Sequence, residues 1–362
     1  MKLPRGGLLA MVALLPMTSC TNSGSSFTPP TVLALAKPVK LLGRPFAFSA
    51  AVHSIWVTTN GASRQSQLWR VPAHSDHVQG SPESLPLHAS IWTVMVGDGR
   101  MLWIAAGRNL GKSTSKDRGV LIKLDPSRRR VISRTPIPSR PTAIAVIKHD
   151  VWIGIEGTKL GRGKLIRVDA STGQVMHTVR GLDFPDSIAP GPIALWVSGV
   201  NGDLWRIDPK TYKVKQYPEY QHLEAITKMF MWTAAHGVQK RDPRTAKLLA
   251  HSAPLTCSPG FVIATETKAW VVSCVKVGPD PQPEGPPQVA QMLFAYDMAQ
   301  DRLVGPPVPI ELLPQVQRPL FRFGSMWILG ADGLERVTSS ALACQVNAAC
   351  AKANETRYSK AK

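Results

Sequence analysis

The chain has 362 residues, with 43 Lys and Arg against 24 Asp and Glu, and a formal net charge of +19. A composition of 44% hydrophobic and 19% charged residues is that of a globular protein, which excludes a disordered or collagen-like chain. The 31 Pro and 28 Gly indicate many turns and argue against an all-helical bundle.

The first residues have the pattern of an export signal. Lys2 and Arg5 precede a short apolar run, Leu8–Leu15, which is far below the roughly 20 residues of a membrane-spanning helix. The next residues, 17–20 (MTSC), resemble the lipobox of bacterial lipoproteins, in which the Cys carries the acyl chains. The resemblance implies a signal peptide over residues 1–19 and a lipid-modified Cys20, with palmitate-type chains in the membrane. The alternative is an ordinary secretory signal with an incidental Cys.

This interpretation places the mature protein in the bacterial cell envelope, on the periplasmic or another extracytoplasmic face. Residues 20–30 are rich in Ser, Gly and Pro, which predicts a flexible tether between the lipid and the fold. We expect one folded domain over residues 31–338 and an Ala-rich tail over residues 339–362.

A short apolar segment centred on a Trp recurs seven times along the chain. The intervals average close to the roughly 40–45 residues of a four-stranded propeller blade. After each Trp segment comes a second alternating run, which in five repeats ends in Asp, as expected for a half-buried strand that enters a tight turn. The repeated Trp are Trp56, Trp103, Trp152, Trp196, Trp232, Trp270 and Trp327, and the repeated Asp are Asp125, Asp169, Asp208, Asp242 and Asp297.

Each repeat therefore predicts an inner strand, a Trp strand, an Asp-ended strand and an outer strand. Seven such units make an all-β fold, a seven-bladed β-propeller of four-stranded antiparallel blades. The last repeat lacks an outer strand, whereas residues 31–42 look like an outer strand that precedes the first inner strand, Phe46–Val52. We expect this N-terminal strand to complete the seventh blade and close the ring. The matching turn positions predict a structural task for the five Asp and not catalysis.

The repeat resembles the YVTN-type propellers and the related virginiamycin B lyase-like propellers, most clearly at Leu165–Val175 and Leu195–Val214. The resemblance implies the propeller fold over nearly the whole mature chain. Its lyase branch implies elimination by a His with an acidic, Mg²⁺-binding neighbourhood. His236 follows a Trp strand at the expected mouth of the central channel and is the candidate base, but no His-x-His or adjacent Glu accompanies it. A solvated or packed His is the alternative.

Besides Cys20 there are four cysteines, Cys257, Cys274, Cys344 and Cys350, and an even number in an exported protein favours disulfides. Folding a hairpin at residues 265–268 would set Cys257 opposite Cys274, while Cys344 and Cys350 would close a small loop in the tail. A metal site is the alternative, but no His has suitable spacing to either pair.

Arg44, Arg140 and Arg318 each precede a Pro at the start of an expected inner strand. Together with long loops that leave three of the Trp strands, they predict a cationic channel mouth that attracts an anionic partner; scattered solvated charge is the alternative. An exported chain without a nucleic-acid module makes nucleic acid an unsuitable partner, whereas anionic envelope surfaces fit the charge.

The leading hypothesis is a lipid-anchored envelope propeller that acts as a non-catalytic binding or assembly scaffold. Its partner is a protein or an anionic envelope ligand, bound by the channel-mouth loops, Arg44, Arg140, Arg318 and His236. No cofactor is expected. The alternative is a metal-dependent, lyase-like enzyme with His236 as base, which would require a divalent cation.

Overall fold

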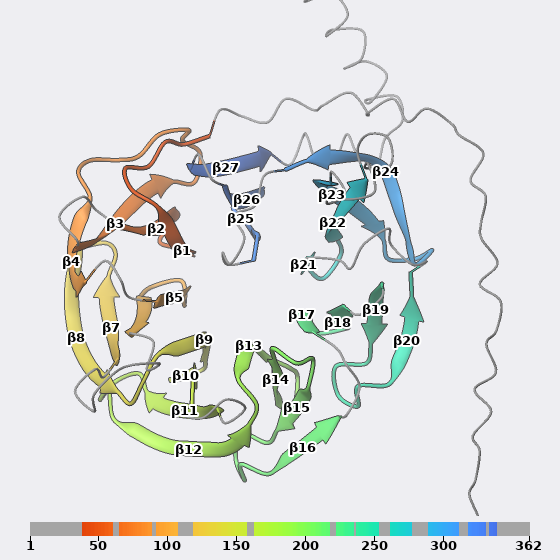
Figure 1. The fold of residues 1–362 in the computed structure, drawn as a ribbon, viewed down its shortest axis with the longest axis horizontal. Coiled ribbons are helices and arrows are strands. Elements are labelled where there is room, and N and C mark those ends of the chain that lie inside the picture. Colours follow the sequence, from red (N-terminus) through yellow and green to blue (C-terminus); the bar gives the residue numbers. More distant parts are fainter. Residues whose placement is uncertain are drawn as a thin grey trace, which may run out of the picture.

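The structure, a computed structural model, describes residues 38–60, 65–88, 92–107, 119–157, 163–217, 222–234, 237–252, 261–276, 289–310, 318–330 and 333–338. Every regular element in this part of the chain is a β-strand, and the strands form seven antiparallel sheets that follow one another around a ring (Figure 1). The predicted seven-bladed β-propeller is therefore confirmed. No helix in the described part of the chain has the length and apolar character needed to cross a membrane.

Within each blade the strands are arranged in chain order, with the first strand nearest the centre of the ring and the last at the rim. Blade 1 comprises β1 (Pro45–Ala51), β2 (Ser54–Asn60), β3 (Gln65–Pro72) and β4 (Glu83–His88). Blade 2 comprises β5 (Trp92–Gly97), β6 (Leu102–Gly107), β7 (Gly119–Asp125) and β8 (Arg130–Ile137). Blade 3 comprises β9 (Pro141–Ile147), β10 (Asp150–Ile155), β11 (Gly163–Asp169) and β12 (Val175–Leu182).

The remaining blades follow the same plan. Blade 4 comprises β13 (Pro185–Pro190), β14 (Leu195–Gly199), β15 (Leu204–Ile207) and β16 (Val214–Tyr217). Blade 5 comprises β17 (His222–Ile226), β18 (Met231–Ala234), β19 (Val238–Arg241) and β20 (Leu248–His251). Blade 6 comprises β21 (Phe261–Ala264), β22 (Ala269–Lys276), β23 (Val289–Asp297) and β24 (Arg302–Pro309), and blade 7 comprises β25 (Leu320–Arg322), β26 (Ser325–Gly330) and β27 (Gly333–Thr338).

The seven repeated Trp occupy the second strand of each blade, and none is more than 3% exposed. These strands are buried along nearly their whole length, as in β6 and β14. The second strand has sheet neighbours on both edges and adjacent blades on both faces. A continuous apolar run with one large side chain therefore fills the space between blades better than an alternating pattern does.

The five repeated Asp make the predicted turns between the third and fourth strands. In each turn, one carboxylate oxygen accepts backbone N–H groups two and three residues later, at distances of 2.7–3.1 Å. These hydrogen bonds lower the pKa of all five carboxyls, so the turns keep their negative acceptors at neutral pH. The predicted structural role of the Asp residues is confirmed.

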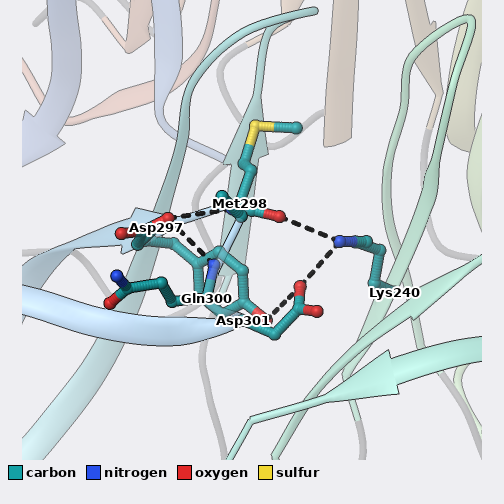
Figure 2. Close-up of polar contacts among 7 residues, drawn as sticks. Lys240, Asp297, Met298, Gln300 and Asp301 are labelled. Atoms are coloured by element: carbon teal, nitrogen blue, oxygen red, sulfur yellow. Dashed lines mark hydrogen bonds and ion pairs between the residues drawn. The ribbon is translucent and has the colours of Figure 1, made fainter.

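A cation in the third strand links several blades to the turn of the next blade. Lys240 of β19 donates to the backbone oxygen of Met298, at 3.0 Å, and to Asp301, at 2.6 Å, in the turn after β23 (Figure 2). Lys123 of β7 likewise donates to the backbone oxygen of Ala170, at 2.8 Å. The alternating third strand thus carries a cation that ties neighbouring sheets together at their turns.

The ring closes between the two ends of the described chain. Val39 pairs with Leu334 of β27 through two backbone hydrogen bonds, of 2.8 and 3.1 Å, so the N-terminal segment covers the outer edge of the three-stranded seventh sheet. The same core cluster contains Val39 and Trp327 together with Phe48 and Trp56 of blade 1. The predicted closure by an N-terminal strand is confirmed at this position.

Candidate functional site

A cavity of about 590 Å³ lies among the inner strands of six blades, β1, β5, β9, β13, β21 and β25. Figure 1 shows these strands surrounding the centre of the ring. Aromatic side chains contribute much of the wall: Phe46, Phe48, Trp92, Phe184 and Phe261. Arg140, Asp186 and Arg318 add the charged groups. An apolar cavity of this size with a few polar groups has the usual make-up of a ligand site in a protein.

Three of the inner strands begin at a similar corner made by Pro. Pro lacks an N–H group and is suited to the first position of a strand, and the inner strands β1, β9 and β13 each begin with Pro. The residue before that Pro turns into the strand, and its backbone oxygen accepts an N–H from the end of the second strand. These bonds are 3.0 Å at Arg44, 3.0 Å at Arg140 and 3.2 Å at Phe184. Equivalent corners thus place Arg44, Arg140 and Phe184 at the same end of their blades.

The structure places the three predicted Arg differently. Arg140 and Arg318 both line the cavity. Arg44 is exposed and lies outside the set of cavity-lining residues in the described part of the chain. Two of the three predicted cations therefore share one cavity, and each of them lies beside a carboxylate that the sequence interpretation did not consider.

Arg140 lies over the ring of Trp92. Its guanidinium carbon is 4.2 Å from the centre of the Trp92 ring, which is within the range of a cation–π interaction. Its Nη1 atom lies 3.4 Å from the Glu156 carboxylate. Within the described residues, the buried Arg140 Nε and Trp92 Nε1 atoms have no hydrogen-bond acceptor. These two donors are therefore buried without a partner among the described residues.

Arg318 reaches across to blade 5. Its Nη1 atom donates to the backbone oxygen of Glu224 at 2.7 Å and lies 3.6 Å from the Glu224 carboxylate. The Glu224 side chain is only 3% exposed, and the Val262 N–H donates to it at 3.4 Å. Burial raises the pKa of Glu224 to about 7, although the Arg318 charge and the Val262 hydrogen bond oppose the rise. Glu224 therefore changes its charge near neutral pH.

Asp186 joins the same group of charges from β13. It accepts a hydrogen bond from Ser198 Oγ at 2.9 Å and lies 3.9 Å from His222 Nδ1. Burial raises the pKa of Asp186, while Arg318 and Ser198 oppose the rise. The negative charge of Asp186 also contributes to the raised pKa of Glu224, because like charges repel. One guanidinium thus serves two carboxylates at the edge of the cavity.

Several predicted site residues lie outside the described residues. These are the candidate base His236, the lipidation site Cys20, and Cys257, Cys344 and Cys350. The loops at 108–118, 158–162 and 277–288 also lie outside them. Within the described part of the chain, no group of three His, Cys, Asp or Glu side chains is arranged to hold a metal ion. The lipid anchor and both disulfides stay predictions.

The hairpin that carries Cys274 folds at the predicted place but in a different register. Setting Cys257 opposite Cys274 required Phe261 to face Trp270, whereas Phe261 faces Val272. At the turn, Thr265 faces Lys268: the Thr265 N–H donates to the Lys268 backbone oxygen at 2.7 Å, and Thr265 Oγ1 accepts the Lys268 N–H at 3.0 Å. The pairing of the two strands is offset by two residues from the expected one. Each side chain stays on the same face of the sheet but lies opposite a different residue, so the register expected for Cys257 and Cys274 was wrong.

The carboxylates at the cavity are the residues that sequence reasoning missed. Asp186, Glu224 and Glu156 come from three different blades, and Glu224 lies 94 residues from Arg318. No fixed spacing connects them. One local signal was available. Glu224 is a carboxylate in the middle of the short strand HLEAI, at the place in the repeat where an inner strand is expected.

No protein-family model and no curated protein sequence matches the chain. In structure it is similar to the computationally designed Ika8 protein, with a TM-score of 0.53 and 12% identity over 83% of this chain and 98% of that chain. It is also similar to the WD40 domain of Pan2 from Neurospora crassa, with a TM-score of 0.56 and 11% identity over 81% of this chain and 88% of that chain. Likeness at such low identity shows the β-propeller fold alone.

Proposed function

We propose that the protein is a binding propeller of the bacterial envelope, held to the membrane through an acylated Cys20, and that its partner enters the cavity at the centre of the ring without being chemically converted. The observation that carries the proposal is the cavity of about 590 Å³ with its aromatic wall. A propeller assembles such a site from many blades, so that side chains distant in sequence converge on one partner.

The polar groups of the cavity favour a partner with an anionic or hydrogen-bond-accepting group beside an apolar or aromatic part. Arg140 and Arg318 both line the cavity. Their guanidinium charges would attract an anionic group, and the aromatic wall would cover the rest of the partner. The class of partner is therefore an anionic small molecule or the acidic, aromatic-bearing segment of an envelope protein.

Photo-crosslinking in intact cells tests this proposal. A photoreactive amino acid replaces Val200, which lines the cavity and is 45% exposed, or Leu42, which is 74% exposed and is not among the cavity-lining residues. We expect an adduct from position 200 that is absent from position 42 and is lost when Arg140→Gln is added. Identical adducts from both positions, or an adduct that Arg140→Gln leaves unchanged, would overturn the proposal.

A further inference from the structure

The ends of blades 4 and 5 that lie away from the cavity form a second surface. In blade 4, Pro190 pairs with Leu195 and Ile207 pairs with Val214, so the turns 191–194 and 208–213 lie at the same end. In blade 5, the pairs Ile226–Met231 and Arg241–Leu248 place the turns 227–230 and 242–247 at the corresponding end. Pro185 and His222 begin their inner strands at the opposite end, where the cavity-lining Phe184 and Val200 lie.

The two blades are adjacent in the ring (Figure 1). Trp196 of blade 4 donates through Nε1 to the backbone oxygen of Pro243, in the turn 242–247 of blade 5, at 2.9 Å. This buried hydrogen bond fixes the turns of the two blades next to each other. We call the surface made by the turns 191–194, 208–213, 227–230 and 242–247 and the first residues of β16 and β20 the turn face.

Large apolar side chains are concentrated on the turn face. Five of them are between 41% and 61% exposed, at Ile193, Val214, Met229, Leu248 and Leu249. Scattered single apolar residues on a surface need no explanation, but five on the turns and outer strands of two adjacent blades are enough for a partner to cover.

Cations surround these apolar side chains. Lys210, Lys213, Lys228, Arg244 and Lys247 are all exposed on the turn face. The nearby carboxylates are engaged by backbone N–H groups: Asp208 and Asp242 each accept two within their own turns, and Glu266 of blade 6 accepts the Lys228 N–H at 3.1 Å. Five cations against three carboxylates leave the turn face positive.

We propose that the turn face docks on an anionic phospholipid bilayer, with its apolar side chains in the interface and its Lys and Arg side chains at the phosphate groups. Apolar side chains interspersed with cations suit the surface of a bilayer, where the apolar groups enter the interface. The flexible Lys side chain can reach a mobile phosphate headgroup in many conformations. The choice of a bilayer over an acidic protein rests on the proposed acylation of Cys20. The docking does not depend on binding in the cavity, because no residue of the turn face lines the cavity.

Vesicle flotation tests the docking without the acyl chain. The full chain carrying Cys20→Ser is mixed with vesicles of equal parts phosphatidylglycerol and phosphatidylcholine, or with pure phosphatidylcholine vesicles. One variant adds Lys213→Gln and Lys247→Gln, and a second adds Met229→Ser and Leu249→Ser. The matched controls are Lys40→Gln and Leu42→Ser, which replace exposed residues near the ring closure. Thermal unfolding checks that every variant is folded.

We expect binding to the anionic vesicles, and little to phosphatidylcholine alone. The double Gln variant should bind on the order of 25-fold more weakly, since about 1 kcal/mol per cation corresponds to roughly fivefold. The double Ser variant should lose about tenfold, and the controls should bind like the parent.

No binding to anionic vesicles, or equal losses in the controls, would overturn the docking. Retention on poly-glutamate that needs Lys213 and Lys247 but not Met229, without vesicle binding, would assign the face to an acidic protein and also overturn it. Failure of flotation would leave the cavity proposal unaffected, because the crosslinking experiment has a separate readout.

Discussion

Glu224 makes the stability of the propeller depend on pH in a direction opposite to that of most carboxylates. Its pKa moves from an ordinary 4.5 to about 7 in the folded protein. Between these two pH values the folded state holds a proton that the unfolded chain has released. The contribution of Glu224 to stability is therefore complete below pH 4.5 and is lost as the pH rises through 7.

The magnitude follows from the same two pKa values. The change from 4.5 to about 7 corresponds to about 3 kcal/mol, at roughly 1.4 kcal/mol for each tenfold change in the dissociation constant. This figure already includes the attraction to Arg318, which opposes the rise. The substitution Glu224→Gln keeps the shape and stays neutral, and Arg318 can still donate to the backbone oxygen of residue 224. The variant should match the parent at pH 4.5 and exceed its free energy of unfolding by up to about 3 kcal/mol at pH 8.

Urea unfolding followed by Trp fluorescence at pH 4.5, 6 and 8 measures this difference. The control is Glu266→Gln, which neutralises an exposed carboxylate in the neighbouring blade. The pKa of Asp186 is also raised. The free energy of unfolding of the Glu224→Gln variant should therefore still fall as the pH rises, but by less than that of the parent. A variant that retains the full pH dependence of the parent would refute the reasoning, since the proton would then belong to another group.

Three further predictions concern two contacts between blades, which urea unfolding measures, and the ring closure, which hydrogen exchange measures. Trp196→Phe removes the bond to Pro243 and should cost about 1 kcal/mol more than Trp232→Phe, whose Nε1 has no acceptor among the described residues; equal costs would count against that bond. Lys240→Met leaves Asp301 without its ammonium at the blade 5–6 contact and should cost about 2 kcal/mol, so an unchanged midpoint would show that the link is not stabilising. Gly333→Ala would set a Cβ 2.2 Å from the Val39 oxygen and should raise hydrogen exchange at the Leu334 amide, whereas Gly99→Ala, with nothing within 4 Å, should not.

The fold was predictable because each blade repeats the same local pattern. A Trp in an apolar run marks the second strand, and an Asp marks the turn after the third strand. Both assignments depend only on neighbouring residues, and the structure confirms them at all seven Trp and all five Asp. Even the closure of the ring followed from a missing strand at one end and a spare strand at the other.

The charged groups of the cavity were only partly predictable. Arg140 and Arg318 were found because an Arg before Pro is a local signal at the start of an inner strand. Their carboxylate neighbours carry no such signal, since Arg318 meets Glu224 across 94 residues and the contact depends on the diameter of the ring. The register of the hairpin at 265–268 was also missed, because a shift of two residues preserves the apolar alternation on which the prediction relied.

Filling the cavity tests its role as the binding site most directly. Ser187 lines the cavity and is half-buried, so Ser187→Trp would occupy the space with little change to the strands. Crosslinking from position 200 is then compared in folded chains with and without Ser187→Trp. We expect the adduct from position 200 to disappear in the Ser187→Trp variant, while the melting temperature of that variant stays the same as that of the parent. An adduct of undiminished yield in the folded Ser187→Trp chain would contradict this expectation.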